Sequence, residues 1–156
     1  MEDKLERMLQ LVGEFFDVKN DPDQLNVTEE VMEKLNKIHP ACMSEYNEGD
    51  GPIVWILMIP TTGAIMKRFL AKEISETQLL NETPLNANYD AIYLCSASVL
   101  PEYRRKGLAQ KVGYEAIGEI MKDHKIKALF YWSFSLEGQA LAEKASRELN
   151  LPLYKR

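Results

Sequence analysis

Three consecutive cations followed by a glycine form the part of the sequence best suited to chemistry. Arg104, Arg105 and Lys106 stand directly before Gly107. Glycine has no Cβ, so another group can approach the backbone closely there. If a helix begins at Gly107, its first amides have no partner within the helix and lie at the positive end of the helix dipole. Such a turn predicts a binding site for an anion, for example a phosphate.

The same charges have a simpler interpretation, in which Arg104–Lys106 is a solvated run that precedes a helix. The position of Gly107 between a predicted strand and a predicted helix favours anion binding over this interpretation. The charges by themselves do not identify the anion.

The elements around the turn are predicted from hydrophobic periodicity. The charge-free segment Ala91–Leu100 predicts a strand buried on both faces, and Gly107–Lys122 predicts a helix. Ala128–Phe134 predicts a second buried strand, and Glu137–Leu149 predicts a last helix that is capped by Asn150. The order strand–helix–strand–helix implies a parallel strand pair, and sheets of this kind bind ligands at the carboxyl ends of their strands.

The first half of the chain predicts helices and a hairpin. Apolar residues at helical spacing indicate a helix over residues 2–17, and Thr28 is the predicted N-cap of a second helix. Ala41–Tyr46 and Ile53–Ile59 flank a loop of turn-forming residues, which predicts a two-stranded hairpin. Helical spacing then predicts a further helix over residues 62–80.

Length and charge restrict the class of protein. A chain of 156 residues predicts one domain over residues 1–156, here of the α/β (α+β) class. The net charge of −5 opposes binding to nucleic acid, although a local basic cluster can still hold a small anion.

Cysteine usage and hydropathy predict the compartment. Cys42 and Cys95 lie far apart and not at metal-ligand spacing, which favours a reducing environment. The charged amino terminus lacks the apolar core of a signal peptide. The longest apolar run, Ile53–Pro60, is far shorter than the roughly 20 residues of a membrane helix. We therefore expect a soluble cytoplasmic protein without a membrane partner.

The turn also carries a family resemblance. The pattern Arg104-x-x-Gly107-x-Ala109, which follows Val99-Leu100-Pro101 and the aromatic Tyr103, resembles the signature of the GNAT superfamily of N-acetyltransferases. The six-residue pattern alone is degenerate, and the preceding strand and following helix make the match more specific.

The resemblance covers residues 90–151 well and residues 25–60 only in the order of elements. Helix 62–80 is an addition, since the family usually continues more directly to the central strand. At the carboxyl end the family tends to show asparagine, alanine, tyrosine and glycine-phenylalanine, and this sequence has at those positions Gln139, Ala142, Ser146 and Asn150-Leu151.

The resemblance implies a GNAT-like mixed central sheet flanked by helices, with a splayed central strand pair, and it implies acetyl-CoA as co-substrate. In such proteins the backbone of Ala97, Ser98 and Val99 would pair with the amide groups of pantetheine. Gln139 could replace the asparagine that helps to position the pantetheine arm. The pyrophosphate would be held by the turn formed by Arg104, Arg105, Lys106, Gly107, Leu108 and Ala109.

The resemblance also implies direct attack of an amine on the thioester, with a proton acceptor and a proton donor from the protein. Tyr93 lies near the family's usual base position, and Asp90 just before it is a second base candidate, although a residue at the start of the strand is the simpler interpretation of Asp90. Tyr93 and Cys95 should share one face of the sheet, but Cys95 fits plain core better than chemistry. Ser146 replaces the tyrosine that commonly protonates the thiolate, and Tyr154 is an alternative donor from the carboxyl-terminal tail.

No metal is expected. His39 and His124 are isolated in the sequence and are interpreted as solvated or capping residues, which do not make a zinc site.

Three functions remain open at this point. The first is an N-acetyltransferase that acts on a small amine or a peptide amine. The second is a module that senses acyl-CoA without transfer, which the serine at position 146 keeps open. The third is nucleic-acid binding through Arg104–Lys106, which the net charge disfavours. Helix 62–80 could form one wall of the acceptor pocket or a homodimer contact.

Overall fold

The strand that leads to the cationic turn is the middle strand of a five-stranded sheet. The computed structural model of the chain describes residues 3–19, 28–132 and 136–156. The three strands β1, β2 and β3 are antiparallel neighbours, whereas β3, β4 and β5 run parallel. In spatial order the strands are β1 (Met43–Glu48), β2 (Gly51–Thr61), β3 (Ala91–Val99), β4 (Ala128–Tyr131) and β5 (Leu153–Lys155). The mixed α/β sheet, the hairpin and the parallel strand pair predicted from the sequence are confirmed.

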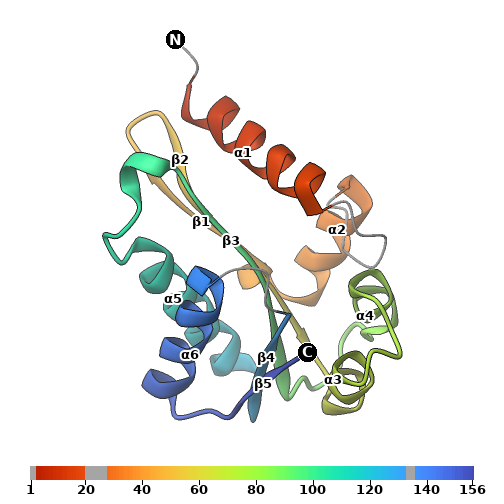
Figure 1. Cartoon of the computed structure of the whole chain (residues 1–156). Coiled ribbons are helices and arrows are strands. Elements are labelled where there is room, and N and C mark those ends of the chain that lie inside the picture. Colours follow the sequence, from red (N-terminus) through yellow and green to blue (C-terminus); the bar gives the residue numbers. More distant parts are fainter. Residues whose placement is uncertain (1–2, 20–27, 133–135) are drawn as a thin grey trace.

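Helices cover both faces of the sheet (Figure 1). The last two long helices, α5 and α6, lie on one face, and the other four α-helices lie on the opposite face. Their bounds are α1 (Lys4–Lys19), α2 (Glu29–Ile38), α3 (Gly63–Leu70), α4 (Glu76–Glu82), α5 (Leu108–Asp123) and α6 (Leu136–Leu149), with two 3₁₀ helices, η1 (Pro40–Cys42) and η2 (Pro101–Tyr103).

This arrangement corrects one predicted helix and adds one strand that was not predicted. The single helix over residues 62–80 is wrong, because the chain breaks it into α3 and α4 at Lys72, which has a left-handed φ of 64°. The short strand β5 was not predicted, because three residues carry too little periodicity to be recognised. The predicted second buried strand ends at Tyr131 among the described residues, and Phe134 lies outside them.

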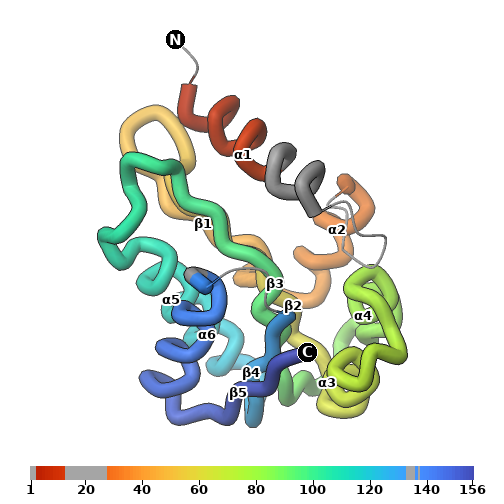
Figure 2. The backbone as a smooth tube through the Cα atoms, viewed as in Figure 1, coloured from red at the N-terminus to blue at the C-terminus, as the bar shows by residue number. Residues whose placement is uncertain are grey.

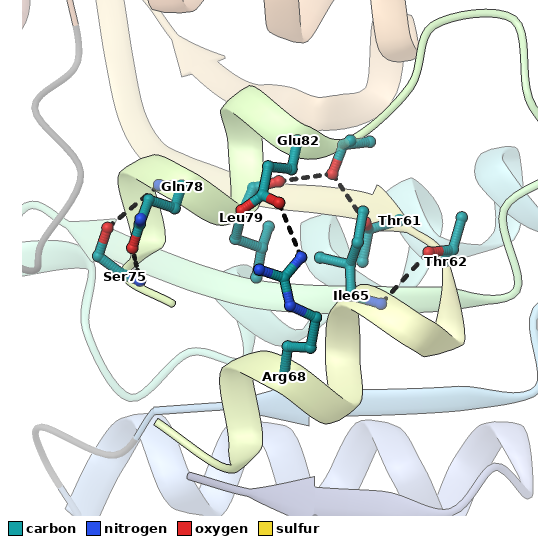
Figure 3. A network of polar contacts seen from close by, with 9 residues as sticks. Thr61, Thr62, Ile65, Arg68, Ser75, Gln78, Leu79 and Glu82 are labelled. Carbon is teal, nitrogen blue, oxygen red and sulfur yellow. Dashed lines mark hydrogen bonds and ion pairs between the residues drawn. The ribbon is translucent and has the colours of Figure 1, made fainter. Parts of the chain in front are cut away.

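Side-chain caps define the ends of α3 and α4 (Figure 3). Thr62 Oγ1 accepts the amide three residues further on at 3.3 Å, which caps α3. In α4 the Ser75 hydroxyl accepts the Gln78 amide at 3.1 Å, and the Gln78 side chain accepts the Ser75 amide at 2.9 Å. This reciprocal capping box fixes the first turn of α4. An ion pair between Arg68 and Glu82, 2.7 Å long, then joins the two helices.

A buried chain of hydroxyl groups ties α4 to β2. Thr83 Oγ1 donates to the Leu79 carbonyl at 2.7 Å, and it lies 2.7 Å from Thr61 Oγ1 (Figure 3). Because the one proton of the Thr83 hydroxyl is used at Leu79, Thr61 must be the donor to Thr83. Both threonines are buried, so the Thr61 hydroxyl depends on Thr83 as its acceptor.

Aromatic rings form the centre of the core on the α3 side of the sheet. The Phe69 ring of α3 meets Tyr93 of β3 at a centroid distance of 4.8 Å and Phe130 of β4 at 5.9 Å, both edge to face. All three side chains are fully buried. These contacts hold the parallel strands β3 and β4 against α3 over the part of the sheet where they are paired.

Two histidines join α5 to η1. His39 is buried, and its Nδ1 accepts the Ala41 amide at 3.0 Å while its Nε2 lies 2.8 Å from an Asp123 oxygen. His39 is therefore a capping residue, as one interpretation of the sequence predicts, but it is not solvated. His124 ends α5, and its ring packs 4.7 Å from the Tyr89 ring.

Replacing the buried hydroxyl of Thr83 should destabilise the fold. In Thr83→Val the Thr61 hydroxyl loses its acceptor, and we expect the free energy of unfolding to fall by about 1–3 kcal/mol. Urea unfolding of the variant and of Thr83→Ser, which keeps the hydroxyl, measures this loss. The double variant Thr61→Val/Thr83→Val should recover part of it, and strictly additive losses would contradict the hydrogen-bonded chain.

The environment of His124 predicts a pH dependence of stability. Its pKa lies below the usual value of 6.5, first because burial disfavours the charged ring and then because His39 is near, while Asp123 acts in the opposite direction. The unfolded chain therefore binds a proton more readily than the folded one as the pH falls through about 6.5. We expect the urea midpoint to be lower at pH 5.5 than at pH 7.5. His124 Nδ1 accepts the Tyr89 amide at 3.4 Å, and in His124→Asn, whose side-chain oxygen can accept the same amide, this difference should shrink.

Candidate site at the end of β3

The turn after β3 has two residues in the left-handed region. Arg105 has a φ of 64° and Gly107 a φ of 74°, and α5 begins at the next residue, Leu108. A left-handed φ costs glycine nothing, whereas it is strained for a residue with a side chain. The glycine at position 107 is thus required first by the backbone conformation. An added Cβ at this position would meet no atom within 4 Å, so the space in front of it is open.

The amides of this turn form an unsatisfied set. The first hydrogen bond of α5 runs from the Lys111 amide to the Gly107 carbonyl at 3.0 Å. Within the described ranges, the amides of residues 105–110 have no acceptor, and no side chain caps the helix at Gly107. The Arg104 amide is different, because it donates to the Pro101 carbonyl at 3.3 Å. The anion-binding amides therefore begin at Arg105, one residue later than the sequence predicts.

A depression of about 280 Å³ lies beside these amides. Its walls are Gly107, Gln110, Lys111, Tyr114, Glu115 and Glu148. The Gln110 side chain donates to Glu148 at 2.8 Å and thereby links α5 to α6. Two of the wall residues, Glu115 and Glu148, are carboxylates, so an anion would fit the end formed by Gly107 and Lys111 best.

The predicted cations remain at the surface around the turn. Arg104, Arg105 and Lys106 are exposed, while Leu108 and Ala109 are half-buried at the start of α5. Lys106 Nζ lies 5.4 Å from the centre of the Tyr103 ring. Arg104 Nε donates to the Val99 carbonyl at 3.0 Å, which folds this side chain back along the end of β3. The guanidinium thus lies between the turn and the strand edge.

The first turns of α1 brace this region. Lys4 Nζ donates to the Glu48 carbonyl of the hairpin at 2.5 Å and lies 5.5 Å from the centre of the Tyr103 ring. Arg7 pairs with Glu102 at 2.5 Å, and this hydrogen bond lowers the pKa of Glu102 to about 2. A helix from the start of the sequence therefore contacts both the hairpin and the 3₁₀ helix that leads into the turn.

The sheet opens at the carboxyl half of β3. β3 pairs with β4 from Ala91 to Leu94, and it continues along β2 to Val99. Figure 2 shows β3 continuing past the end of β4 toward the hairpin. The register with β2 shifts between Leu57 and Met58, so Cys95 is an extra residue on β3 and forms a β-bulge. In the described part of the chain, no strand continues beside Ser96–Val99 on the β4 side.

The backbone groups of the open segment point alternately to its two sides. The Leu100 amide donates to Ile53 of β2 at 3.0 Å, so the groups of Leu100 and Ser98 face β2, and those of Ala97 and Val99 face away from it. Ala97 is exposed, and Val99 is half-buried. Of the three residues predicted to pair with a ligand, Ala97 and Val99 face the opening, where Arg104 Nε already occupies the Val99 carbonyl, and Ser98 faces β2. The prediction that the whole strand is buried on both faces is wrong for this half.

A buried polar cluster lies beside the bulge. Tyr93 Oη donates to Glu76 Oε2, and Cys95 Sγ lies 3.6 Å from the same oxygen. Both side chains therefore point to one face of the sheet, as the alternation predicts. Glu76 is 4% exposed and Tyr93 is 0% exposed, whereas Cys95 is half-buried. We call these three residues the Glu76 cluster.

The Tyr93 hydroxyl is a hydrogen-bond donor to Glu76 at the position where the resemblance implies a proton acceptor. Its pKa is raised far above the usual value, first because burial disfavours the phenolate, and further because Cys95 and Glu76 are near; Arg156 acts weakly in the opposite direction. The hydroxyl therefore stays protonated at neutral pH and serves as a hydrogen-bond donor. The role of Tyr93 is to hold the Glu76 carboxylate in place.

A stacked arginine lies next to the Glu76 cluster. The guanidinium carbon of Arg156 is 4.4 Å from the centres of both the Phe69 and the Trp132 rings. Its Nη1 donates to the Ile74 carbonyl at 2.8 Å, and its amide donates to Tyr131 at 2.9 Å. The two aromatic rings and the Ile74 carbonyl hold the guanidinium charge beside α3 and the end of β4.

The other predicted catalytic residues lie elsewhere. Asp90 stands at the amino end of β3, and its Oδ1 accepts the Gly63 amide at 2.6 Å, so it caps α3 at the opposite end of the strand from the turn. Tyr154 is 45% exposed on β5 and pairs in register with Phe130, the partner of Tyr93. It shares the face of Tyr93 but lies two strands away.

Two residues of α6 complete the predicted set. The Gln139 side chain donates from Nε2 to the Glu143 carboxylate at 3.1 Å within the helix. Ser146 Oγ donates to the Leu151 carbonyl at 2.5 Å, where Asn150 has a left-handed φ of 55°. The predicted C-cap at Asn150 is confirmed, and the Ser146 hydroxyl is used to close the helix end.

Glu76 is the site residue that sequence reasoning missed. The only local signal is the capping box that begins at Ser75, which predicts a helix with an acidic residue in its first turn. That pattern usually indicates a solvated carboxylate that stabilises the helix dipole. The contact with Tyr93 joins residues 17 positions apart, and periodicity does not report such a contact.

No protein family model matches this chain, and no curated protein and no solved structure matches it. Among the described residues, no three His, Cys, Asp or Glu side chains gather in a way that could hold a metal ion. No helix in these ranges has both the length and the apolar character needed to cross a membrane.

The two cysteines should differ sharply in reactivity. Cys42 is fully buried, and burial raises its pKa to about 12, whereas Cys95 is half-buried at the open end of β3. We expect iodoacetamide at pH 8 to label Cys95 in the folded protein and Cys42 only after denaturation, since the thiolate is the reactive form. Peptide mass spectrometry measures both sites. Equal labelling rates would show that the end of β3 is not open.

Proposed function

We propose that this protein is an acetyl-CoA-dependent N-acetyltransferase that resembles the GNAT superfamily and transfers an acetyl group to an amine of a small molecule or peptide. One observation carries the proposal: the unsatisfied amides of residues 105–110 come shortly after a strand whose outer edge has no strand partner at Ala97 and Val99, where Arg104 Nε occupies the Val99 carbonyl. A ligand that combines a diphosphate with an amide-bearing arm matches both features. Coenzyme A is such a ligand.

The open edge has a definite length. From Val99 back to Cys95 the strand covers four residues, or about 13 Å at the rise of a β-strand. An extended arm that is bound along this edge from Val99 would bring its far end to the bulge. The amide and carbonyl of Ala97 and the amide of Val99 would bind the arm as an added strand, which is how open sheet edges recognise extended ligands.

The chain's own residues would contribute positioning and charge. The amides after Arg105, at the positive end of α5, would neutralise the diphosphate together with Lys106 and Lys111. When bound, acetyl-CoA would supply the activated acetyl group. Holding that group at the bulge beside an amine converts a bimolecular reaction into one within a single complex.

A second function is favoured by Ser146. Its hydroxyl is bound to the Leu151 carbonyl, so no proton donor stands at the position where the family tends to have tyrosine. A module that binds acyl-CoA without transferring the group is consistent with this arrangement. Release of free thiol in the presence of an amine panel distinguishes the two functions, because a sensor would bind acetyl-CoA and release none.

A carboxylate at position 107 should abolish coenzyme binding. In Gly107→Glu the side chain projects into the open space before the amides, and it repels a diphosphate while its backbone is also strained. We expect the Kd for acetyl-CoA, measured by calorimetry, to rise at least about 100-fold, which corresponds to about 2.7 kcal/mol. Thermal unfolding should still show a folded protein.

Two matched variants separate charge from strain. Gly118→Glu makes the same change about 16 Å further along α5, also in open space, and should leave the Kd unchanged. Gly107→Ala introduces the strain without the charge and should weaken binding much less than Gly107→Glu. Undiminished affinity in Gly107→Glu would refute the site.

A further inference from the structure

The Glu76 cluster places a buried carboxylate at the point where β3 and β4 part. Glu76 comes from the first turn of α4, in the segment between β2 and β3 where the resemblance offers no counterpart. A buried carboxylate is costly unless it is hydrogen-bonded, and here two donors from one strand, Tyr93 and Cys95, meet the same oxygen. The oxygen that receives them is held in a fixed place next to the bulge.

The hydrogen-bond direction identifies the acceptor atom of the cluster. Tyr93 keeps its proton and donates it, so Glu76 Oε2 is an acceptor. The Glu76 carboxyl is therefore the group of the cluster on which both donors converge. Arg156, at the end of β5, is the cation that faces Tyr93.

The exposure of the cluster indicates from where it can be reached. Tyr93 and Glu76 are buried, whereas Cys95 is half-buried, so the cluster approaches solvent at Cys95. Cys95 is the bulged residue, directly beyond the last β4 partner of β3. Its side chain lies on the α3–α4 face of the sheet, because it contacts Glu76. A group that reaches the bulge from this face would meet Cys95, whose Sγ lies 3.6 Å from the Glu76 carboxylate.

We propose that Glu76 is the proton acceptor for the attacking amine and that the acceptor substrate is a protonated primary amine which enters from the α3–α4 face at the bulge. This inference rests on the proposed acetyltransferase function and assigns its acceptor class and its base. Tyr93 is a positioning residue that holds the carboxylate. The segment formed by α3 and α4 is then part of the catalytic machinery.

The proton and electron balance of the step is as follows. Glu76 accepts one proton from the ammonium group, and the lone pair that this frees forms the new N–C bond with the thioester carbonyl carbon. The C–S bond breaks, and the sulfur leaves with its electron pair as the thiolate. The second proton lost from nitrogen goes to the thiolate, and the proton on Glu76 returns to solvent. The products are an amide, a free thiol and one released proton.

Glu76→Gln tests the proton acceptor with little change of shape. The amide oxygen of glutamine can still accept the Tyr93 hydroxyl, so the fold should be retained, but the residue cannot take up a proton. Glu73→Gln is the matched control, because Glu73 is an exposed glutamate three residues earlier. Tyr93→Phe is a second variant that keeps the carboxylate and removes only its anchoring donor.

The readouts are acetyl-CoA affinity by calorimetry and thiol release with a panel of polyamines, amino acids and lysine-containing peptides at pH 6 to 9. We expect Glu76→Gln to lower kcat about 10²- to 10⁴-fold, which is the usual contribution of a general base, and to lose the acid limb of the pH profile. The KM for acetyl-CoA should stay within about twofold. Tyr93→Phe should lower kcat less and shift the acid limb, and Glu73→Gln should behave as the wild type.

Each result has a distinct meaning. If acetyl-CoA binds and thiol is released, but Glu76→Gln keeps the rate and the pH profile of the wild type, the assignment of Glu76 is refuted and the acetyltransferase remains. If acetyl-CoA does not bind, or if no amine in the panel releases thiol, the proposed enzyme is refuted together with its base. If Glu76→Gln does not fold, an unchanged pH profile in Tyr93→Phe overturns the inference.

Discussion

The hydrogen-bonding of β3 is the constraint on which the rest of the structure depends. A strand presents amides and carbonyls to both sides, and buried backbone groups must find partners. β2 satisfies one side of β3 along most of its length, whereas β4 accompanies it only to Leu94. The extra residue Cys95 lies where the pairing with β4 ends, and the bulge that it forms bends and twists β3 there. The turn and α5 follow the part of β3 that β4 does not accompany.

The open edge and the turn form one continuous surface because of chain direction. β3 ends where η2 and the turn begin, and α5 starts with its unsatisfied amides after Gly107. The strained φ of Arg105 is part of the folded turn before any ligand arrives. Contacts from α1 and the Arg104 side chain hold this arrangement. A ligand would thus find donors already oriented, and preorganised sites lose less entropy on binding.

The elements and the turn could be predicted from the sequence wherever the signal comes from neighbouring residues. The glycine, the cations and the strand–turn–helix order identified the turn, and Thr28 and Asn150 were recognised as caps because capping needs only neighbouring residues. The break at Lys72 escaped prediction, because a left-handed lysine leaves no mark in the periodicity. The position of Asp90 before β3 makes it a base candidate from the sequence, but its carboxylate accepts the amide of Gly63, 27 residues away. Glu76 was missed for the same reason, because its environment is made by tertiary packing.

The brace between α1 and the turn has a consequence for ionic strength. The Arg7–Glu102 pair and the Lys4–Asp50 pair, 3.7 Å long, are formed by partly exposed side chains, and mobile ions screen such pairs with a Debye length of about 8 Å in physiological salt. Added electrolyte would loosen the amino-terminal helix from the hairpin and from η2 while it also weakens any anion held by the amides. A titration in salt would then report two effects, one on the ligand and one on the scaffold beneath it.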